Sequence, residues 1–249
     1  MKGSTPPNVY LSDIDEERFD IRAARAPHIT VDTLPSVLDF CRANAVIFLI
    51  ARCPTDDMAA VHAMEQEGFH LMDTLVFYSR KLTEIPVLRD TTTMTIHPFV
   101  PGQENDIERV AAESFRGYKG HYHSDARLGR AGCDAVYISW AVRSCVSRKV
   151  ADEVLVAESN ASVAGFITLR LSSPAEGEGP LWAVAPRFQR QGVAGLLMVH
   201  AMLWCRLKGA QRMTMSTQVT NLLAQKVWTR MGFEPGHSYY TFHKWFDAP

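Results

Sequence analysis

No segment of this chain is apolar for long enough to cross a membrane. The longest apolar run is 45–51, whereas a transmembrane helix needs about 20 such residues. Residues 1–10 are polar and contain proline, which does not fit a secretory signal peptide. We therefore expect a cytoplasmic protein without a membrane partner.

The chain also has no large excess of positive or negative charge. The 249 residues include 26 Lys and Arg and 27 Asp and Glu, for a net charge of −1, whereas nucleic-acid-binding proteins carry a basic excess. The 5 cysteines have no metal-like spacing, and their odd number argues against a disulfide framework. We expect reduced thiols, no nucleic-acid partner and no metal.

Two common phosphate-binding signatures, the Walker loop and Gly-x-Gly-x-x-Gly, are missing as well. The chain has instead an apolar segment, 181–185, which stops at Pro186 and leads into an amphipathic helix expected over 196–208. Pro186 cannot donate a ladder hydrogen bond, and Gly192 and Gly195 let a ligand approach the backbone. Because the first N–H groups of a helix lack internal partners at its positive end, we expect this junction to bind a pyrophosphate.

This junction resembles a known motif. Gln-x-x-Gly-x-Ala at 189–194, after a strand that ends in proline, is similar to the acyl-CoA-binding motif of the GCN5-related N-acetyltransferases (GNAT). Asn-x-x-Ala at 221–224, followed by Trp228 and Gly-Phe at 232–233, resembles a second pattern of that family. The resemblance implies the α/β GNAT fold with a mixed sheet. It also implies an acyl-CoA-dependent N-acyltransferase that uses acetyl-CoA or another short-chain acyl-CoA and no metal.

The resemblance also assigns residues to the acyl-CoA. We expect the pyrophosphate on the backbone of the loop, the pantetheine beside the strand that ends at Val184, and the N–H of Val184 as oxyanion donor. Asn221 has two compatible interpretations, as the cap of the next helix and as a pantetheine contact. The expected acyl-CoA-binding residues are Val184, Gln189, Arg190, Gln191, Gly192, Val193, Ala194, Gly195, Asn221 and Trp228.

Trp228 departs from the family pattern, which usually has a tyrosine here as the acid for the departing thiolate. An indole N–H cannot serve as such a proton donor. A thiol with a pKa near ~8.5 leaves as an anion without much help, and positioning supplies ~7–11 kcal/mol. We therefore expect direct transfer in a ternary complex, driven mainly by proximity. The predicted catalytic residues are Val184, Asn221, His123 and Tyr240. The amine proton would go to water, His123 or Asp125, and Tyr239, Tyr240 or His243 would replace the acid.

Residues 114–128 form a segment dense in aromatic, basic and histidine side chains. Such loops often carry function, although a loop that packs its own aromatics is the alternative. With the helix expected over 133–147 and the run 216–221, this segment resembles bacterial nucleotide-sugar N-acyltransferases of the dTDP-fucosamine type. The expected acceptor-binding residues are Phe115, Arg116, His121, Tyr122, His123, Asp125, Arg127, Tyr137, Trp140, Thr217 and Gln218.

The second resemblance implies a nucleotide-linked amino sugar as acceptor, most simply dTDP-linked, and a place in lipopolysaccharide or O-antigen synthesis. Two other functions stay open. One is an acyltransferase for another amine, such as an amino acid, a polyamine, an antibiotic or a protein. The other is a non-catalytic acyl-CoA sensor, which Trp228 would fit.

A repeat runs through the chain. When Gly-Phe at 68–69 is aligned with Gly-Phe at 232–233 without gaps, Asp57 falls on Asn221. A β-rich run precedes and an aromatic run follows both sites, which indicates a duplicated strand–helix–strand unit. The first copy lacks the Gln-x-x-Gly-x-Ala loop, so it should not bind CoA.

The polar segment 81–93 is expected to separate two domains. Residues 1–88 would form a reduced GNAT-like domain and residues 89–249 the catalytic GNAT domain. Exposed edges of a splayed sheet are compatible with a homodimer. In the second domain the patterns predict strands at 94–100, 154–157, 163–171, 180–185 and 213–219, and helices at 104–114, 133–147, 196–208 and from 221.

Overall fold

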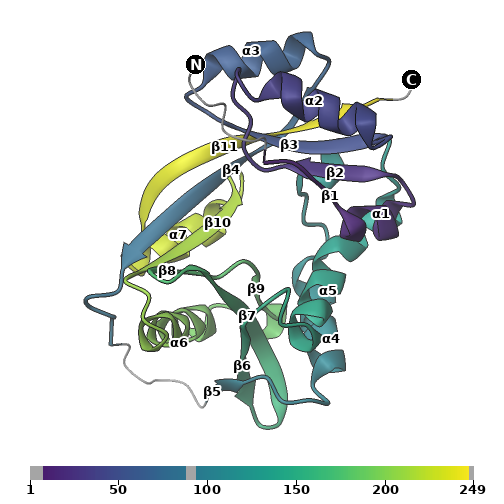
Figure 1. The fold of residues 1–249 in the computed structure, drawn as a ribbon. Coiled ribbons are helices and arrows are strands. Elements are labelled where there is room, and N and C mark those ends of the chain that lie inside the picture. Colours follow the sequence, from purple (N-terminus) through teal and green to yellow (C-terminus); the bar gives the residue numbers. More distant parts are fainter. Residues whose placement is uncertain (1–7, 88–93, 247–249) are drawn as a thin grey trace. The chain divides into compact units, whose positions relative to one another are not determined.

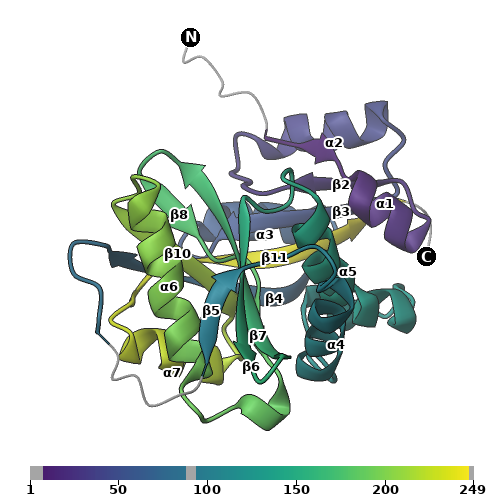
Figure 2. The ribbon, with the colours of Figure 1, turned by 90° about the horizontal axis from the view of Figure 1, so that it is seen from below.

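In the computed structural model, the described residues are 8–87 and 94–246, so part of the predicted linker lies outside them. Within these ranges no helix has the length and apolarity needed to cross a membrane. Strands and helices are interspersed along the chain, with β6 to β9 following one another without a helix between them (Figures 1 and 2). The elements are β1 (Tyr10–Leu11), α1 (Asp13–Phe19), β2 (Ala23–Ala26), α2 (Leu34–Ala43), β3 (Phe48–Pro54), α3 (Met58–Gln66), β4 (His70–Lys81), β5 (Thr95–Pro98), α4 (Glu104–Ser114), η1 (His121–Ser124), α5 (Arg130–Val146), β6 (Glu153–Ser159), β7 (Ser162–Ser173), β8 (Glu176–Glu178), β9 (Trp182–Val184), η2 (Pro186–Phe188), α6 (Val193–Leu207), β10 (Arg212–Gln218), α7 (Leu222–Arg230) and β11 (Glu234–Trp245).

The chain forms two compact units. Unit 1 contains the described residues up to Val76, then 119–133 and those from His237 on, and unit 2 contains 77–118 and 134–236. The compact units therefore do not follow the sequence boundary expected near residue 88. Residues 119–133 and the end of the chain group with the N-terminal part because their contacts are there: β11 pairs with β3 over Tyr239–Trp245.

The sheet of unit 2 is mixed, as the sequence predicted. β6 and β7 form an antiparallel hairpin, β5 pairs with β6, and β8 joins β7 to β10, with which it runs parallel. The hairpin turns at Asn160 and Ala161, whose φ angles are 48° and 57°. Positive φ at both central positions matches the twist of the flanking strands.

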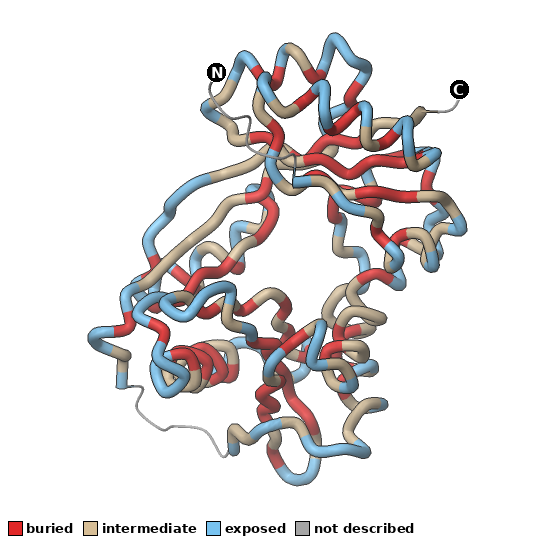
Figure 3. The backbone as a smooth tube through the Cα atoms, in the orientation of Figure 1, coloured by how far each residue is buried: buried red, intermediate tan, exposed pale blue. Residues whose placement is uncertain are grey.

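Alternation along β6 decides which helix covers which face. Val154 and Val156 belong to the core cluster that contains α4, whereas Leu155 and Ala157 belong to the cluster that contains α6. Successive strand residues point to opposite faces, so α4 and α6 cover opposite faces of the hairpin (Figure 2). The buried residues follow both strands (Figure 3).

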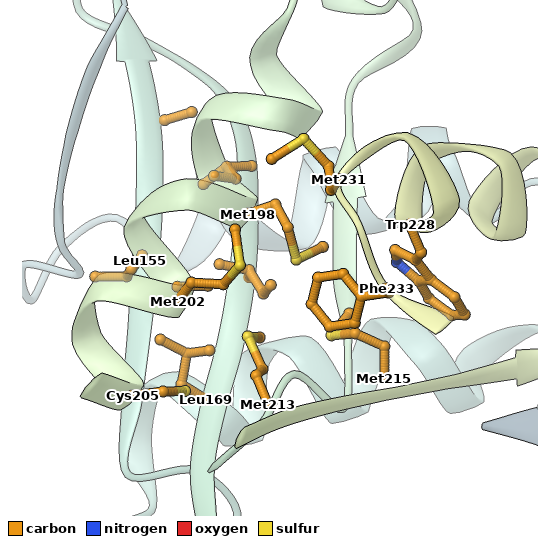
Figure 4. Packing of buried hydrophobic residues seen from close by; sticks show 14 of the residues in the cluster. Leu155, Leu169, Met198, Met202, Cys205, Met213, Met215, Trp228, Met231 and Phe233 are labelled. Atoms are coloured by element: carbon orange, nitrogen blue, oxygen red, sulfur yellow. The ribbon is translucent and has the colours of Figure 1, made fainter. Parts of the chain in front are cut away.

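The α6 face is rich in methionine. The sulfur-containing side chains gather from α6, β10 and the end of α7 around two aromatic rings, and all of them are buried (Figure 4). Methionine is flexible and polarizable, so it fills irregular space next to aromatic rings. The members of this group labelled in Figure 4 are Met198, Met202, Cys205, Met213, Met215, Trp228, Met231 and Phe233.

In unit 1, β2 pairs with β1 and runs parallel to β3, and β3 pairs antiparallel with β11. α2 and α3 lie on one face of these strands (Figure 1) and share a core cluster with Ala51, Cys53 and Phe242. His243, next to Phe242, points to the other face, where its ring lies 4.8 Å from that of Phe48.

The structure confirms the strand–helix–strand repeat. One constant shift in numbering brings β3, α3 and β4 onto β10, α7 and β11, with every boundary in register. Asp57 accepts a hydrogen bond from the N–H of Ala60 at 3.0 Å, and Asn221 accepts from Ala224 at 3.3 Å. The repeat therefore includes the capping side chains. We call 34–81 the first copy and 198–245 the second copy.

Both copies end their helix in the same way. Gly68 and Gly232 have φ angles of 76° and 74°, values that glycine adopts without strain. The N–H of Phe69 bonds the carbonyl of Met64 at 3.0 Å, and that of Phe233 bonds the carbonyl of Trp228 at 2.9 Å. Trp228 is therefore the counterpart of Met64.

Candidate functional site

The edge of β9 is the first part of the candidate site. β9 pairs with β7, with Val184 opposite Gly165, and the N–H of Ala185 bonds the carbonyl of Ala164 at 2.8 Å. Hydrogen-bonded and non-hydrogen-bonded pairs alternate in an antiparallel ladder, so Val184 makes no backbone hydrogen bond to β7. Its N–H therefore points to the opposite edge of β9, as an oxyanion donor requires.

The edge of β9 that faces away from β7 has no partner strand within the described residues, because β9 pairs with β7 alone. β10 pairs with β8 through Arg212, Met213 and Thr214, and then continues to Gln218. The two strands are therefore splayed, and backbone groups of β9 are left for a ligand to pair with.

The loop after β9 leads directly into α6. Gly192 is the N-cap with φ 85°, and the first bond of the helix joins the N–H of Leu196 to the carbonyl of Gly192 at 3.0 Å. The helix thus begins at Val193 and not at 196 as predicted. Val193, Ala194 and Gly195 form its first turn, and their N–H groups are those that a helix leaves without internal partners. This arrangement fits a pyrophosphate.

The two glutamines of the motif hold the loop. Gln189 Nε2 donates to the carbonyl of Val184 at 3.0 Å, and Gln191 Nε2 donates to that of Arg187 at 2.9 Å. Between them the exposed Arg190 has φ 61°, a conformation that is uncommon without glycine. The glutamine side chains therefore bind backbone carbonyls and fix the loop, and Arg190 places an exposed cation beside the start of α6.

The end of α4 touches both splayed strands, and the sequence did not single out the residues that do so. Ser114 Oγ donates to the carbonyl of Val184 at 3.1 Å. Tyr118 donates its phenol to Oε1 of Gln218 at the end of β10. Both residues lie in the segment expected to bind the acceptor, and the signal that could have found them is their place directly after a helix that packs on β9.

Several predicted acceptor residues surround Tyr118. The rings of Phe115 and Tyr137 are stacked with centroids 4.9 Å apart, and Tyr118 meets Tyr137 edge-on, also at 4.9 Å. Trp140 packs with Tyr137 against the α4-face core. Arg116 is exposed, whereas Thr217 and Gln218 are buried. These predicted residues all belong to unit 2, together with the acyl-CoA loop.

Asn221 is the N-cap of α7, so the capping interpretation is confirmed. Its amide also donates to Thr217 Oγ1 at 2.9 Å. Trp228 is fully buried, with its ring 6.4 Å from Trp182 of β9 and 5.5 Å from Tyr78. Its indole N–H has no hydrogen-bond partner among the described residues. Trp228 therefore fills space beside β9.

The remaining predicted residues belong to unit 1, where His121 and Asp125 of the segment 119–133 are buried and take part in a hydrogen-bonded network. His243 Nδ1 lies 2.8 Å from Asp125 Oδ2, and His243 Nε2 lies 2.8 Å from His121 Nδ1. Trp245 donates to Asp125 at 2.9 Å, and the guanidinium of Arg127 lies 3.9 Å from the centre of the Trp245 ring.

Burial and hydrogen bonds shift the pKa values in this network. Burial, together with the neighbouring His243, keeps the pKa of His121 well below its usual value, so this imidazole is neutral. Burial alone would raise the pKa of Asp125, but hydrogen bonds from His243, Trp245 and the backbone of Arg127 outweigh it and lower the pKa. The network thus holds an ionised carboxylate beside two imidazoles.

Tyr122 belongs to a second buried group. Its phenol donates to Asp15 at 2.8 Å and lies 2.6 Å from Nη2 of Arg25, which also pairs with Asp15. His123 Nδ1 accepts from the N–H of Gly120 at 3.2 Å.

Tyr240, the predicted acid, packs against the α2–α3 core next to Phe242. Its place gives it a packing role in unit 1.

Comparison with known proteins agrees with this geometry. Residues 112–233 match the model of the acetyltransferase (GNAT) family. The spore coat polysaccharide biosynthesis protein SpsD of Bacillus subtilis (strain 168) is 28% identical over 201 residues. That alignment covers 80% of this chain and 66% of the relative, so the chain spans just under two thirds of the relative's length.

Two solved structures share the fold at low identity. A functionally unknown conserved protein from Staphylococcus epidermidis is 13% identical with a TM-score of 0.66, over 98% of this chain and 93% of that one. A GCN5-related N-acetyltransferase from Sphaerobacter thermophilus is 15% identical with a TM-score of 0.63, over 96% and 76% of the two chains. The predicted fold class is confirmed.

Proposed function

Residues 112–233 match the model of the acetyltransferase (GNAT) family, and from this premise we propose that the protein transfers an acyl group from acyl-CoA to the amine of a nucleotide-linked amino sugar. Acetyl-CoA or another short-chain acyl-CoA is the donor. The observation that carries the donor half is the splay of β9 and β10 beside the first turn of α6.

The residues of unit 2 fit each part of an acyl-CoA. The N–H groups of Val193, Ala194 and Gly195 lie at the positive end of α6 and suit the pyrophosphate. The free edge of β9 offers the N–H of Val184 and the carbonyl of Trp182 to a pantetheine amide or to the thioester. Asn221, the N-cap of α7 shortly after the end of β10, donates its amide to Thr217 Oγ1 of that strand.

Catalysis would then be direct transfer. The neutral amine attacks the thioester carbonyl, and the N–H of Val184 stabilises the oxyanion that develops. Holding the amine against the thioester supplies much of the rate, since effective molarities lower a barrier by ~7–11 kcal/mol.

The acceptor half rests on two observations. The relative with 28% identity is named for polysaccharide synthesis, and polysaccharides are assembled from nucleotide-activated sugars. The aromatic group of Phe115, Tyr118 and Tyr137 next to the exposed Arg116 suits a base or sugar ring beside a diphosphate. A dTDP sugar is the form that we propose.

The experiment is acyl-CoA-dependent thiol release with purified protein and a panel of dTDP- and UDP-amino sugars, amino acids and polyamines. Release with nucleotide amino sugars alone is the expected result. Release with a polyamine or an amino acid instead would contradict the proposed acceptor but support the acyltransferase activity.

A second candidate is an acyl-CoA sensor without turnover, which the buried indole at position 228 favours. Acyl-CoA binding without thiol release on any amine would support the sensor and sink the transferase.

A further inference from the structure

The acid that protonates the departing thiolate has to come from somewhere other than position 228. Trp228 is fully buried, and an indole does not give up a proton at neutral pH. Tyr78 lies against Trp228, but its phenol bonds Gln225 at 3.2 Å. It lines a surface cavity of about 360 Å³ on the outer side of α7, with Lys226 and Arg230 among the other lining residues.

Tyr118 is placed differently. It follows α4 by one turn, in a segment that is fixed at two points: Ser114 bonds the carbonyl of Val184, and the phenol of Tyr118 bonds Gln218. These two partners are the ends of β9 and β10, the strands that are splayed. The segment therefore carries a phenol to the place where the thioester would lie between the strand ends.

The surroundings of Tyr118 hold it there. Its ring meets Tyr137 edge-on at 4.9 Å and Phe115 at 5.7 Å. Gln218 is buried, so the hydrogen bond to its amide is shielded from water, which strengthens it. An amide oxygen accepts the phenol proton without removing it, and a short rotation about the side chain would direct the same O–H to a sulfur atom.

We propose that Tyr118 is the general acid of the transfer, and this rests on the proposed function. The amine nitrogen forms the new C–N bond, the C–S bond breaks with its electron pair on sulfur, and the O–H proton of Tyr118 goes to that sulfur. The proton that the nitrogen loses restores the phenol. The phenol thus starts and ends the cycle protonated, and the free thiol of CoA leaves.

The first test is kinetic. Tyr118→Phe keeps the ring and its packing but removes the proton, so kcat should fall by about 10²-fold or more, the lower range for general acids, while the KM for acyl-CoA stays near the wild-type value. Tyr78→Phe is the matched control and should leave kcat unchanged. Loss in Y78F with none in Y118F would overturn the proposal in favour of Tyr78.

Two further variants separate chemistry from positioning. Gln218→Met breaks the same hydrogen bond but keeps the phenol, so its kcat should fall less than that of Y118F. Adding Trp228→Tyr to Y118F places a phenol at the position where the family usually has one, and should recover part of kcat. Equal losses in Q218M and Y118F, with no recovery in Y118F/W228Y, would reduce Tyr118 to a positioning residue.

The last measurement needs no acceptor, so it separates this inference from the proposed function. Calorimetry would compare the affinities of CoA and desulfo-CoA. A phenol that bonds the sulfur should make wild type favour CoA by about 2- to 10-fold, the usual range for one hydrogen bond, and Y118F should lose that preference. If no amine is acylated, the proposed acceptor fails but this comparison still decides on Tyr118. The same preference in both proteins would overturn its contact with sulfur.

Discussion

The first and second copies have the same order and length of strand, helix and strand, but they differ in how the strand before each copy pairs. In the first copy the preceding strand, β2, pairs in parallel with β3, with Ala23 opposite Phe48. In the second copy the preceding strand, β9, pairs with β7 and not with β10, which among the described residues pairs on that side only with β8 and only over Arg212–Thr214. The strand–helix–strand module is therefore not itself the acyl-CoA site. The site arises where the entering strand is held apart from the module.

The helices that enter the two copies differ in the same way. α2 and α6 end alike, since the N–H of Val46 bonds the carbonyl of Cys41 at 2.9 Å and that of Ala210 bonds Cys205 at 3.0 Å. At the other end, α6 begins at Val193 after a left-handed glycine, whereas α2 begins only at Leu34, the counterpart of Met198. The first copy thus lacks the turn that would meet a phosphate.

Charge at the start of the two helices should give the largest contrast. Gly192→Asp places a carboxylate where we expect the pyrophosphate, and should weaken acyl-CoA binding about 100-fold, or roughly 2.7 kcal/mol. Thr33→Asp adds the same charge at the N-cap of α2 and should leave binding unchanged. Calorimetry with acetyl-CoA measures both.

Gly192→Asn is the control for the backbone, because asparagine tolerates a left-handed conformation without charge. Its loss of affinity should be much smaller than that of G192D. Equal losses in G192N and G192D would mean that conformation, and not charge, governs the site.

Trp228 and Met64 should give the next largest effect. Both are fully buried at equivalent positions, and truncation of such side chains to alanine costs about 2–5 kcal/mol. Trp228→Ala should lower the free energy of unfolding and weaken acyl-CoA binding, since its ring faces Trp182 of β9. Met64→Ala should lower stability alone. Denaturant unfolding measures the stability of both variants, and acetyl-CoA titration measures their affinities. Equal affinities in both variants would contradict a role of Trp228 in acyl-CoA binding.

The buried imidazole of unit 1 should make stability depend on pH. The folded pKa of His121 lies below its unfolded value, so the unfolded chain binds the extra proton as pH falls below about 6.5. Stability should decline from that pH downward, by at most ~1.4 kcal/mol per pH unit for one proton, until the folded pKa is reached. His121→Gln should flatten this decline. An unchanged pH profile of unfolding in H121Q would contradict the assignment.

The capping residues should give the smallest effect on stability. Loss of an N-cap side chain costs about 1 kcal/mol, so Asp57→Ala and Asn221→Ala should destabilise to a similar extent. Asn221→Ala should also raise the KM for acyl-CoA, because its amide bonds Thr217 in the splayed strand β10, whereas D57A should not. Equal KM values for acyl-CoA in D57A and N221A would mean that Asn221 only caps α7 and does not contact acyl-CoA.

The sequence predicted local structure where one pattern dominates. Helix 104–114 is confirmed at both ends, and the repeat is in register to the residue. The start of α6 was placed too late because Gly195 was assigned to the turn. Of the two glycines, only Gly192 has a positive φ. β8 was missed because Glu176–Glu178 has neither apolar alternation nor β-branched residues, and its pairing with β7 and β10 supports it instead.

Long-range contacts explain the rest. Nothing near His121 in sequence indicates His243, which lies on the last strand, so the segment 114–128 was interpreted as an acceptor-binding loop. Ser114 and Tyr118 were hidden for the same reason, since their partners Val184 and Gln218 lie far along the chain. The loop motif at 189–195 was visible because its function resides in backbone conformation that glycine encodes locally.

Amide hydrogen exchange with and without acetyl-CoA tests most directly that only the second copy is built to bind the donor. We expect slower exchange at Val184 and at Val193–Gly195 when acetyl-CoA is present, and no change at β2 or at the start of α2. Protection of both copies, or of the first copy alone, would contradict the claim that the splayed strand and the added helix turn make the site.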